Sequence, residues 1–310
     1  PASLRHRWSV VRRLKQLEAQ IAPEVVFTVF GPSYWRPKAK HLLGFALPQI
    51  VYADEEYMRS LSVVQRWKYL SYKKRKFRSC ADRYVTESED VSRRLEKCFK
   101  LPLDSVFTVG NTCGAHFFDA NAQEVLTLPH SLPDVFKLIV ISANHSHKNL
   151  SLIPEVCSSL LRNGVRCMFY VTLAPDDYES IMGDHREMIY NLGPVDVKYC
   201  PSLYQQADAL FLPTRLECFT ASYPEAMAMR KPIITSDLGF ARSICANAAE
   251  YFDPTSAQDA VRAIQLIMTN EPRRDFLVSE GSKRLRGFPS ALKRAEEYVE
   301  ILHSLVKEKI

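Results

Sequence analysis

The chain has 310 residues, of which 46% are hydrophobic and 25% are charged. These values are ordinary for a folded globular protein, and they exclude extensive disorder. No run of about 18 apolar residues occurs, so the sequence predicts no membrane-spanning helix. At roughly 150 residues per domain, the length predicts about two domains.

The positive charge is concentrated in the first part of the chain. The net charge is +6, and residues 1–130 hold 21 Lys and Arg against 13 Asp and Glu, a net +8. The remaining residues hold 20 against 22, a net −2. This asymmetry indicates two domains with different partners.

The eight cysteines are scattered and contain no C-x-x-C pair. Disulfide frameworks are typical of short secreted chains, so we expect reduced thiols in a cytoplasmic protein. Their spacing also makes a cysteine metal site improbable.

The first half contains short apolar runs that are rich in β-branched or aromatic residues. These runs predict strands at residues 25–30, 49–52, 83–86 and 106–109. Between the last two, Ser88 is followed by an acidic first turn, which predicts a capped helix.

The second half repeats this alternation. Strands are expected at residues 137–141, 166–171, 189–193, 209–212 and 232–235, with helices near 150–163 and 222–229. Such strands indicate parallel sheets covered on both faces. We expect domains at 1–128 and 129–289, divided in the stretch 120–133. An amphipathic helix over 290–310, with Leu292, Ala295, Tyr298, Val299, Leu302 and Leu305 on one side, would cross back to the first domain.

Ligands of open parallel sheets bind outside the carboxyl ends of the strands. In the first half this rule gives Gly31, Asp54 and Asn111 as candidate ligand-site residues, and it also draws attention to Glu87. Asp54 is equally suited to cap a helix. Asn111 is equally suited to a turn in the left-handed region.

Two glutamates stand eight positions apart, Glu217 at the end of a strand and Glu225 in the following helix. The turn between them would offer free backbone N–H groups, which favour a phosphate. Two carboxylates beside an anion site suit a ligand with phosphate in the middle and hydroxyls at both ends, such as a nucleotide sugar. On spacing alone, an acidic helix cap beside an exposed glutamate is the simpler interpretation.

The spacing fits the E-x7-E signature, and its surroundings resemble the retaining glycosyltransferases of family 4. The likeness continues in the same order through residues 142–150, 191–195, 203–214, 232–237 and 249–254. It covers residues 135–255 strongly, and residues 20–118 loosely through 81–88 and 109–111. The resemblance implies an α/β protein of the GT-B fold, with two Rossmann-like, doubly wound domains facing a cleft.

The resemblance also implies a role for each motif residue. Glu225 would accept hydrogen bonds from ribose hydroxyls, and Glu217 would bind sugar hydroxyls near the reacting carbon. Lys148 would neutralise the departing diphosphate, so Glu217 and Lys148 are the expected catalytic residues. The other donor-site candidates lie in these loops and in the matching segment 191–195: Ser142, Asn144, Asn149, Gly193, Val195, Phe219, Thr220 and Ala221.

The chain departs from the family pattern in the donor loops. Cys218 and Thr220 stand where small residues are usual, so the turn is more crowded. Residues 143–144 stand where many members have an Arg, which leaves Lys148 alone on the diphosphate or assisted by Arg215.

The start of the chain also departs from the pattern. It begins with Pro1, and nothing before Val25 supplies the family's first strand and Gly-rich loop. We therefore expect a chain that lacks the start of its amino-terminal domain.

The sequence contains no convincing set of metal ligands. No D-x-D occurs, and the pair His145 and His147 has no third or fourth ligand in register. A polar loop is the expected role of the two histidines, and we expect catalysis without a metal.

Residues 66–78 carry seven basic side chains in thirteen, interleaved with aromatics. Such a segment suits an anionic membrane surface. It also suits a nucleic acid, or a solvated basic helix with its aromatics in the core. Acceptors of the family are often lipid-linked, so the membrane is favoured over a nucleic acid, and no nucleic-acid partner is expected. The solvated helix is an equally good interpretation.

The resemblance therefore implies a metal-independent, retaining transfer of a hexose from a nucleotide-diphosphate sugar to a glycan or lipid-linked saccharide. No convincing covalent nucleophile is present, so front-side attack is expected. We expect a cytoplasmic enzyme, peripheral on the inner face of the membrane. The alternative is an inactive GT-B module that binds a nucleotide or glycan. A sugar-nucleotide epimerase on the same scaffold is less favoured, because it would lack the ordered motifs.

Overall fold

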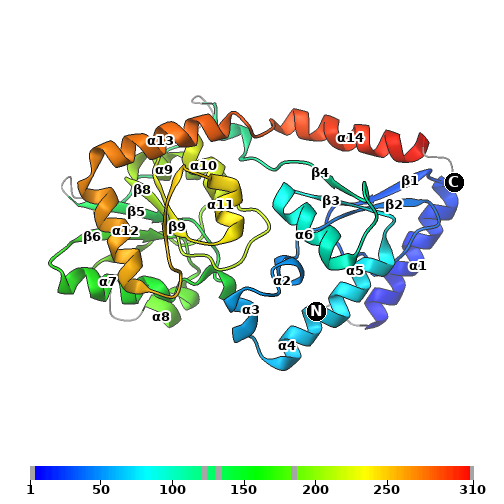
Figure 1. Ribbon diagram of the computed structural model, residues 1–310, viewed down its shortest axis with the longest axis horizontal. Helices are drawn as coiled ribbons and strands as arrows, with labels where there is room; N and C mark the ends of the chain where they lie inside the picture. Colours follow the sequence, from blue (N-terminus) through cyan, green and yellow to red (C-terminus); the bar gives the residue numbers. More distant parts are fainter. Residues whose placement is uncertain (1–3, 120–123, 130–134, 183–186, 308–310) are drawn as a thin grey trace. The chain divides into compact units, whose positions relative to one another are not determined.

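The computed structural model describes residues 4–119, 124–129, 135–182 and 187–307. By its internal contacts the chain divides into two compact units, which we call unit 1 (residues 1–111 and 292–310) and unit 2 (residues 112–291). Each contains one parallel sheet (Figure 1). Most of the expected dividing stretch at 120–133 lies outside the described residues. No helix in the described ranges is long and apolar enough to cross a membrane.

Unit 1 is built on a sheet with the strand order β1-β2-β3-β4. The strands are β1 (Val25–Thr28), β2 (Lys40–Gly44), β3 (Arg83–Thr86) and β4 (Val106–Thr108), and neighbours pair in parallel. The helical elements are α1 (Leu4–Ile21), α2 (Pro48–Val51), α3 (Glu56–Ser60), α4 (Val63–Trp67), the π-helical turn η1 (Lys68–Lys73), α5 (Lys74–Cys80), α6 (Glu89–Phe99) and α14 (Ala291–Lys307).

The predicted strand at 49–52 is wrong. These residues form the short helix α2, and the strand of this part of the chain is β2, which the sequence analysis missed. Four apolar residues do not distinguish a buried strand from a buried helical turn. Pro48 in the first turn favours the helix, because its fixed φ suits that position.

The helix predicted after Ser88 is confirmed as α6. The Ser88 hydroxyl accepts a hydrogen bond from the Val91 amide, and Glu89 and Asp90 occupy the first turn. This cap satisfies one of the amide groups that a helix leaves unpaired at its start.

A glycine is required where β2 ends. A Cβ atom on Gly44 would lie 1.6 Å from the carbonyl oxygen of Val29, in the segment that follows β1. No side chain fits there, so Gly44 permits the close approach of the two backbones.

The amphipathic helix α14 packs against the sheet of unit 1 (Figure 1). Leu305 is buried with Leu42 and Val85, and the Tyr298 ring lies 5.2 Å from the Phe27 ring. The packing face is Tyr298, Ile301, Leu302 and Leu305, which follows helical spacing. The predicted face was partly wrong, because Leu292, Ala295 and Val299 are exposed.

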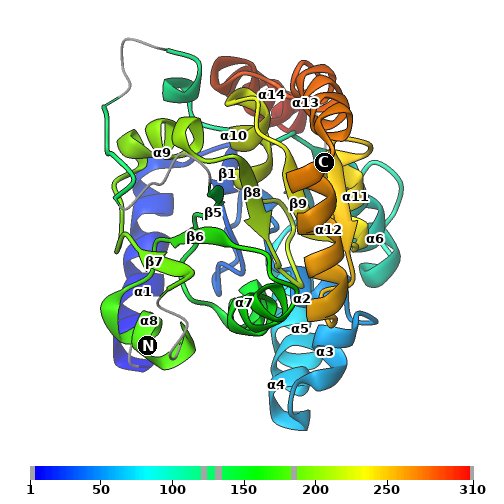
Figure 2. The ribbon, with the colours of Figure 1, turned by 90° about the vertical axis from the view of Figure 1, so that its left-hand side faces the viewer.

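Unit 2 is built on a sheet with the strand order β10-β9-β8-β5-β6-β7, again all parallel (Figure 2). Its strands are β5 (Phe136–Val140), β6 (Cys167–Val171), β7 (Ile189–Asn191), β8 (Ala209–Leu212), β9 (Ile233–Ser236) and β10 (Ala249–Phe252). Its helices are η2 (Ala115–Phe117), η4 (Ser146–Lys148), α7 (Leu152–Arg162), α8 (Pro175–Met182), η5 (Val197–Tyr199), α9 (Cys200–Gln206), α10 (Ser222–Ala228), α11 (Gly239–Cys245), α12 (Ala257–Thr269) and α13 (Glu271–Leu285).

The core of unit 2 is formed by strands that are almost wholly buried, with α7 and α12 packed on each other against them. The rings of Phe211 on β8 and Phe252 on β10 stack at 5.4 Å. This burial confirms the expectation of apolar strands covered on both faces. All eight cysteines lie among the described residues, and none forms a disulfide.

Candidate donor site

The topology of unit 2 singles out one position at the edge of its sheet. From β5 the chain continues to β6 and β7 on one side, whereas β8 leads to β9 and β10 on the other. The strand order therefore reverses between the neighbouring strands β5 and β8. Open α/β sheets bind their ligands at such a point, beyond the carboxyl ends of the strands. Lys148 follows β5 and Glu217 follows β8, so both residues lie at this point of the sheet.

Lys148 and Glu217 form a largely buried ion pair. The Lys148 Nζ atom donates to Glu217 Oε1 at 2.5 Å, and only 8% of Glu217 is exposed. Glu217 Oε1 also lies 3.1 Å from the Thr214 hydroxyl. A buried charge needs such partners, because burial removes its hydration.

Backbone hydrogen bonds hold the two loops together. The Arg215 amide donates to the carbonyl oxygen of His147 at 2.7 Å, and the Thr214 hydroxyl lies 3.2 Å from the same oxygen. Within the first loop, Lys148 ends the short helix η4, and its amide donates to His145 at 2.8 Å. The backbone therefore fixes Lys148 independently of its ion pair.

Asn149 is the C-cap of the short helix η4 and directs the chain out of this loop. It has a left-handed backbone conformation (φ 56°), and its side-chain amide donates to the carbonyl oxygen of Pro254 at 2.9 Å. Asn adopts this conformation more readily than most residues. The predicted donor residue Asn149 is thus engaged in shaping the loop.

The two histidines of this loop stack, with ring centroids 5.6 Å apart. The pKa of His147 is lowered, chiefly by burial, although Glu217 at 4.0 Å opposes this shift. The described residues contain no group of three or more His, Cys, Asp or Glu side chains able to hold a metal ion. Metal independence stays a prediction.

Glu225 lies on α10 and is also largely buried. It accepts a hydrogen bond from the hydroxyl of Tyr204 at 3.1 Å. Burial raises the pKa of Glu225 to about 7, although the Tyr204 hydrogen bond opposes this shift. The N-cap of α10 is Ala221, with no side-chain cap. The simpler interpretation of the two glutamates, a helix cap beside an exposed residue, is therefore wrong.

Two further donor candidates are held by the segment that follows β6. The Ser142 amide donates to the Thr172 hydroxyl at 3.1 Å, and the Asn144 side chain donates to Asp177 at 2.9 Å. Both contacts orient the segment that leads from β5 to Lys148.

The remaining candidates border the loops after β7 and β8. Gly193 has φ +74° and faces open space, and Val195 is half-buried. Phe219 packs edge-on against Phe288 with centroids 6.2 Å apart, and Thr220 is buried. Together with Ala221, these residues lie on loops at the carboxyl edge of the sheet.

The acceptor-side candidates Gly31, Asp54 and Asn111 lie in unit 1, and Gly31 has a structural role. The Gly31 amide donates to the carbonyl oxygen of Gly44 at 2.9 Å, and a Cβ on Gly31 would collide with Phe77 and Leu43. Asp54 is exposed, and its predicted capping role is wrong because Glu55 is the N-cap of α3.

Asn111 belongs to a polar cluster that the sequence analysis did not recognise. Its side-chain amide donates to Glu87 Oε1 at 2.5 Å, and Arg294 of α14 lies 3.4 Å from the same oxygen. The alternative of a left-handed turn at Asn111 is wrong, since its backbone φ is not positive. Burial raises the pKa of Glu87, whereas Arg294 and Asn111 lower it. The available signal was the position of Glu87 after a strand.

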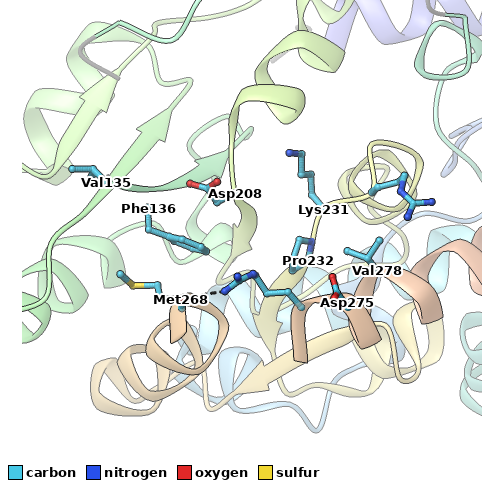
Figure 3. A pocket seen from close by; sticks show the side chains of 10 residues that line it. Val135, Phe136, Asp208, Lys231, Pro232, Met268, Asp275 and Val278 are labelled. Carbon is cyan, nitrogen blue, oxygen red and sulfur yellow. Dashed lines mark hydrogen bonds between the residues drawn. The ribbon is translucent and has the colours of Figure 1, made fainter. Parts of the chain in front are cut away.

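A separate cavity of about 480 Å³ lies at the opposite, amino-terminal edge of the unit 2 sheet (Figure 3). Phe136 begins β5, Asp208 precedes β8 and Pro232 precedes β9. The other residues that line it are Val135, Arg230, Lys231, Met268, Arg274, Asp275 and Val278. This cavity is therefore distinct from the Lys148–Glu217 site.

Comparison with known proteins gives a family match for part of this site, and Lys148 lies outside the matched residues. Residues 183–284, which include Glu217 and Glu225, match the family model described as "Glycosyl transferases group 1". The chain carries a group 1 glycosyltransferase domain. No curated protein matches the chain in sequence.

Solved structures resemble the whole chain. The sucrose-phosphate synthase (tll1590) from Thermosynechococcus elongatus has a TM-score of 0.78 at 15% identity, covering 98% of this chain and 79% of that chain. A glycosyltransferase from Rickettsia africae ESF-5 has a TM-score of 0.70 at 14% identity, covering 99% and 83%. The structure described as "Trehalose-6-phosphate from E. coli bound with UDP-2-fluoro glucose" has a TM-score of 0.68 at 12% identity, covering 100% and 80%.

At these identities the similarities establish the fold, and the fold is GT-B. The predicted fold class, an α/β protein with two parallel sheets, is confirmed. The roles of the individual residues around the group 1 domain stay predictions.

Proposed function

We propose that this chain is a cytoplasmic, metal-independent enzyme that transfers a hexose, with retention of configuration, from a nucleotide-diphosphate sugar to a hydroxyl group of a glycan or lipid-linked saccharide. The observation that carries the proposal is the buried Lys148–Glu217 pair at the reversal point of the unit 2 sheet. The match of residues 183–284 to the group 1 family supports it.

Lys148 is suited to bind the diphosphate. Its ammonium group has three N–H donors, so it can keep its hydrogen bond to Glu217 while donating to a phosphate oxygen. The backbone contacts around His147 hold Lys148 in place beforehand, and a charge held in advance stabilises a transition state without reorganisation. In the proposed reaction, Lys148 therefore stabilises negative charge as it develops on the leaving diphosphate.

Glu225 is suited to bind the ribose. Tyr204 donates to one of its oxygens, and a carboxylate can accept further hydrogen bonds from two ribose hydroxyls. Because its pKa is about 7, the ligand hydroxyls would favour the ionised form that accepts these bonds.

The proposed chemistry is a front-side displacement. The acceptor hydroxyl oxygen forms a bond to the anomeric carbon on the face that the diphosphate leaves, and the bond between that carbon and the diphosphate oxygen breaks. The departing diphosphate takes the acceptor proton, so no protein base is required. Glu217, beside Lys148, would hold the sugar hydroxyls during this step.

Isothermal titration calorimetry with UDP, GDP, ADP and TDP tests the donor site, and UDP is tried first because one structural relative is described as bound with UDP-2-fluoro glucose. We expect one nucleotide to bind the wild type, and K148A and E225A to weaken that binding at least tenfold. The matched control is K231A, which removes a half-buried lysine at the opposite edge of the sheet. Binding that none of the three variants alters would contradict the assigned site.

A coupled assay of nucleotide release then separates the enzyme from its alternative. Binding of a nucleotide sugar without transfer to any saccharide acceptor would favour an inactive binding module. The absence of nucleotide binding in the wild type would contradict the enzyme and a nucleotide-binding module, and would leave only a glycan-binding module.

A further inference from the structure

Residues 63–80, which we call the basic segment, form a continuous run of helical structure through α4, η1 and α5. The segment begins at a capping box, in which Ser62 and Gln65 each accept a backbone hydrogen bond. It contains seven basic residues and no acidic residue: Arg66, Lys68, Lys73, Lys74, Arg75, Lys76 and Arg78.

The first turns of the basic segment expose large apolar side chains. Val63 is 82% exposed, Val64 75% and Trp67 60%, and no residue of α4 is buried. The segment is anchored at its other end, where Phe77 and Cys80 are buried. Figure 1 shows α4 at the end of unit 1 that lies away from β1 to β4. The alternative of a solvated helix with its aromatics in the core is therefore wrong for Trp67.

Apolar side chains gathered in contact with water mark a surface that another partner covers. Here they alternate with positive charge, since Arg66 and Lys68 flank Trp67 and are themselves exposed. The pKa of Lys73 is lowered by burial and by the neighbouring charge of Lys68, so the positive groups crowd one another. A partner must therefore offer both an apolar layer and negative charge.

The interface of an anionic bilayer offers both within a few ångströms of depth. An amphipathic helix there buries its apolar side chains at the boundary between headgroups and acyl chains, while Lys and Arg bind anionic headgroups. Tryptophan favours this depth because its ring is apolar and its N–H is polar.

We propose that the basic segment docks this chain on an anionic lipid bilayer, with Val63, Val64 and Trp67 at the acyl boundary and the basic side chains on the headgroups. The proposal goes beyond the donor-site chemistry and does not depend on it. It commits to lipid rather than nucleic acid because phosphate contacts alone would leave the three exposed apolar side chains uncovered.

Co-sedimentation with vesicles measures the interaction. We expect the wild type to bind vesicles of phosphatidylcholine with 30% phosphatidylglycerol and not pure phosphatidylcholine, because about 1 kcal/mol per basic residue comes from anionic lipid. Removing three exposed charges in R66Q/K68Q/R75Q should then lower partitioning about 100-fold. The matched control R12Q/R13Q/K15Q removes three exposed charges from α1 and should change partitioning less than threefold.

The apolar contribution has its own control. V63S/V64S/W67S should lower partitioning at least tenfold at constant charge, because binding scales with the apolar area buried. L103S removes another highly exposed apolar side chain of unit 1 and should have no effect.

Tryptophan quenching locates the contact. The chain has three tryptophans, of which Trp35 is buried and Trp8 and Trp67 are exposed. Vesicles with brominated acyl chains should quench W8F, which retains Trp67, and should leave W67F unquenched. Quenching that survives W67F, equal losses in the α1 control, or nucleic-acid binding with no vesicle binding would each overturn the proposal.

Discussion

Each unit holds a largely buried glutamate in the loop that follows a strand, but different parts of the chain stabilise the two. Glu217 in unit 2 is bound by Lys148 and Thr214, which lie within the span of 142–225 that carries the donor motifs. Glu87 in unit 1 is bound by Asn111 and by Arg294 from the final helix.

The difference separates a ligand-binding role in unit 2 from a structural role in unit 1. Lys148 is fixed by its own loop, so its charge is available to a ligand at the sheet's reversal point. Arg294 reaches Glu87 from α14, whose Leu305 is buried in the core of unit 1. We therefore interpret the first cluster as a binding site and the second as a link that fastens α14 to its sheet.

The largest expected effect is on catalysis, from K148A. Removing one group that stabilises transition-state charge costs about 100- to 1,000-fold in rate, and we expect the transfer rate to fall by that factor. K148R keeps a charge and should recover part of the rate. An activity within threefold of wild type in K148A would refute the comparison.

Glu225 should make stability depend on pH. Its pKa is about 7 in the folded protein, above its ordinary value of 4.5, so the folded state holds a proton that the unfolded state has lost. The free energy of unfolding should then fall as pH rises from 4.5 to 7, by on the order of 3 kcal/mol in total. The contribution is fully present below pH 4.5 and absent above pH 7.

Urea unfolding at pH 5 and pH 8 measures this effect. E225Q lacks the titrating group, so its stability should fall less between the two pH values than that of the wild type. Identical pH dependence in both proteins would show that Glu225 titrates normally.

The unit 1 cluster should affect stability and not donor binding. R294A removes a cation beside the buried Glu87, and we expect the protein to lose about 1–3 kcal/mol of stability. Nucleotide affinity, measured by calorimetry, should stay within twofold of wild type. A loss of nucleotide affinity without a loss of stability would reverse the two assigned roles.

The smallest effect is expected at Gly193. Its φ of +74° disfavours a side chain, yet the space around it is open, so G193A should cost about 1 kcal/mol of stability. G164A is the matched control, since Gly164 also has a positive φ (+69°) and open surroundings away from the donor loops. If the Gly193 loop binds the base, only G193A should also weaken nucleotide binding.

The contrast between unit 1 and unit 2 also explains which parts of the fold could be predicted from the sequence. The strands β5 to β9 of unit 2 are apolar runs closed by recognisable loops, so their positions and the Lys148 loop could be predicted, whereas β10 was not predicted as a strand. The sequence did not predict β2, because Lys40 and His41 interrupt the apolar pattern. His41 is nevertheless buried, and its ring forms hydrogen bonds with Thr28 and with the carbonyl oxygen of Cys80. These partners, which offset the cost of burying the ring, are distant in sequence.

The candidate donor site could likewise be predicted from the sequence, whereas the Glu87 cluster of unit 1 could not. Glu217 and Glu225 stand in one motif, and the spacing alone drew attention to both. The contact between Glu87 and Arg294 joins residues 207 positions apart, and no local pattern indicates it. The raised pKa of Glu225 was equally hidden, since it arises from burial of the carboxyl group in the folded protein, which the hydrogen bond from Tyr204 on α9 opposes.

The most direct test of the central claim is the anomeric configuration of the product. NMR spectroscopy of the glycoside formed from a bound nucleotide sugar would give that configuration. The proposed front-side transfer at Lys148 and Glu217 predicts the same configuration as in the donor. An inverted product would contradict the account.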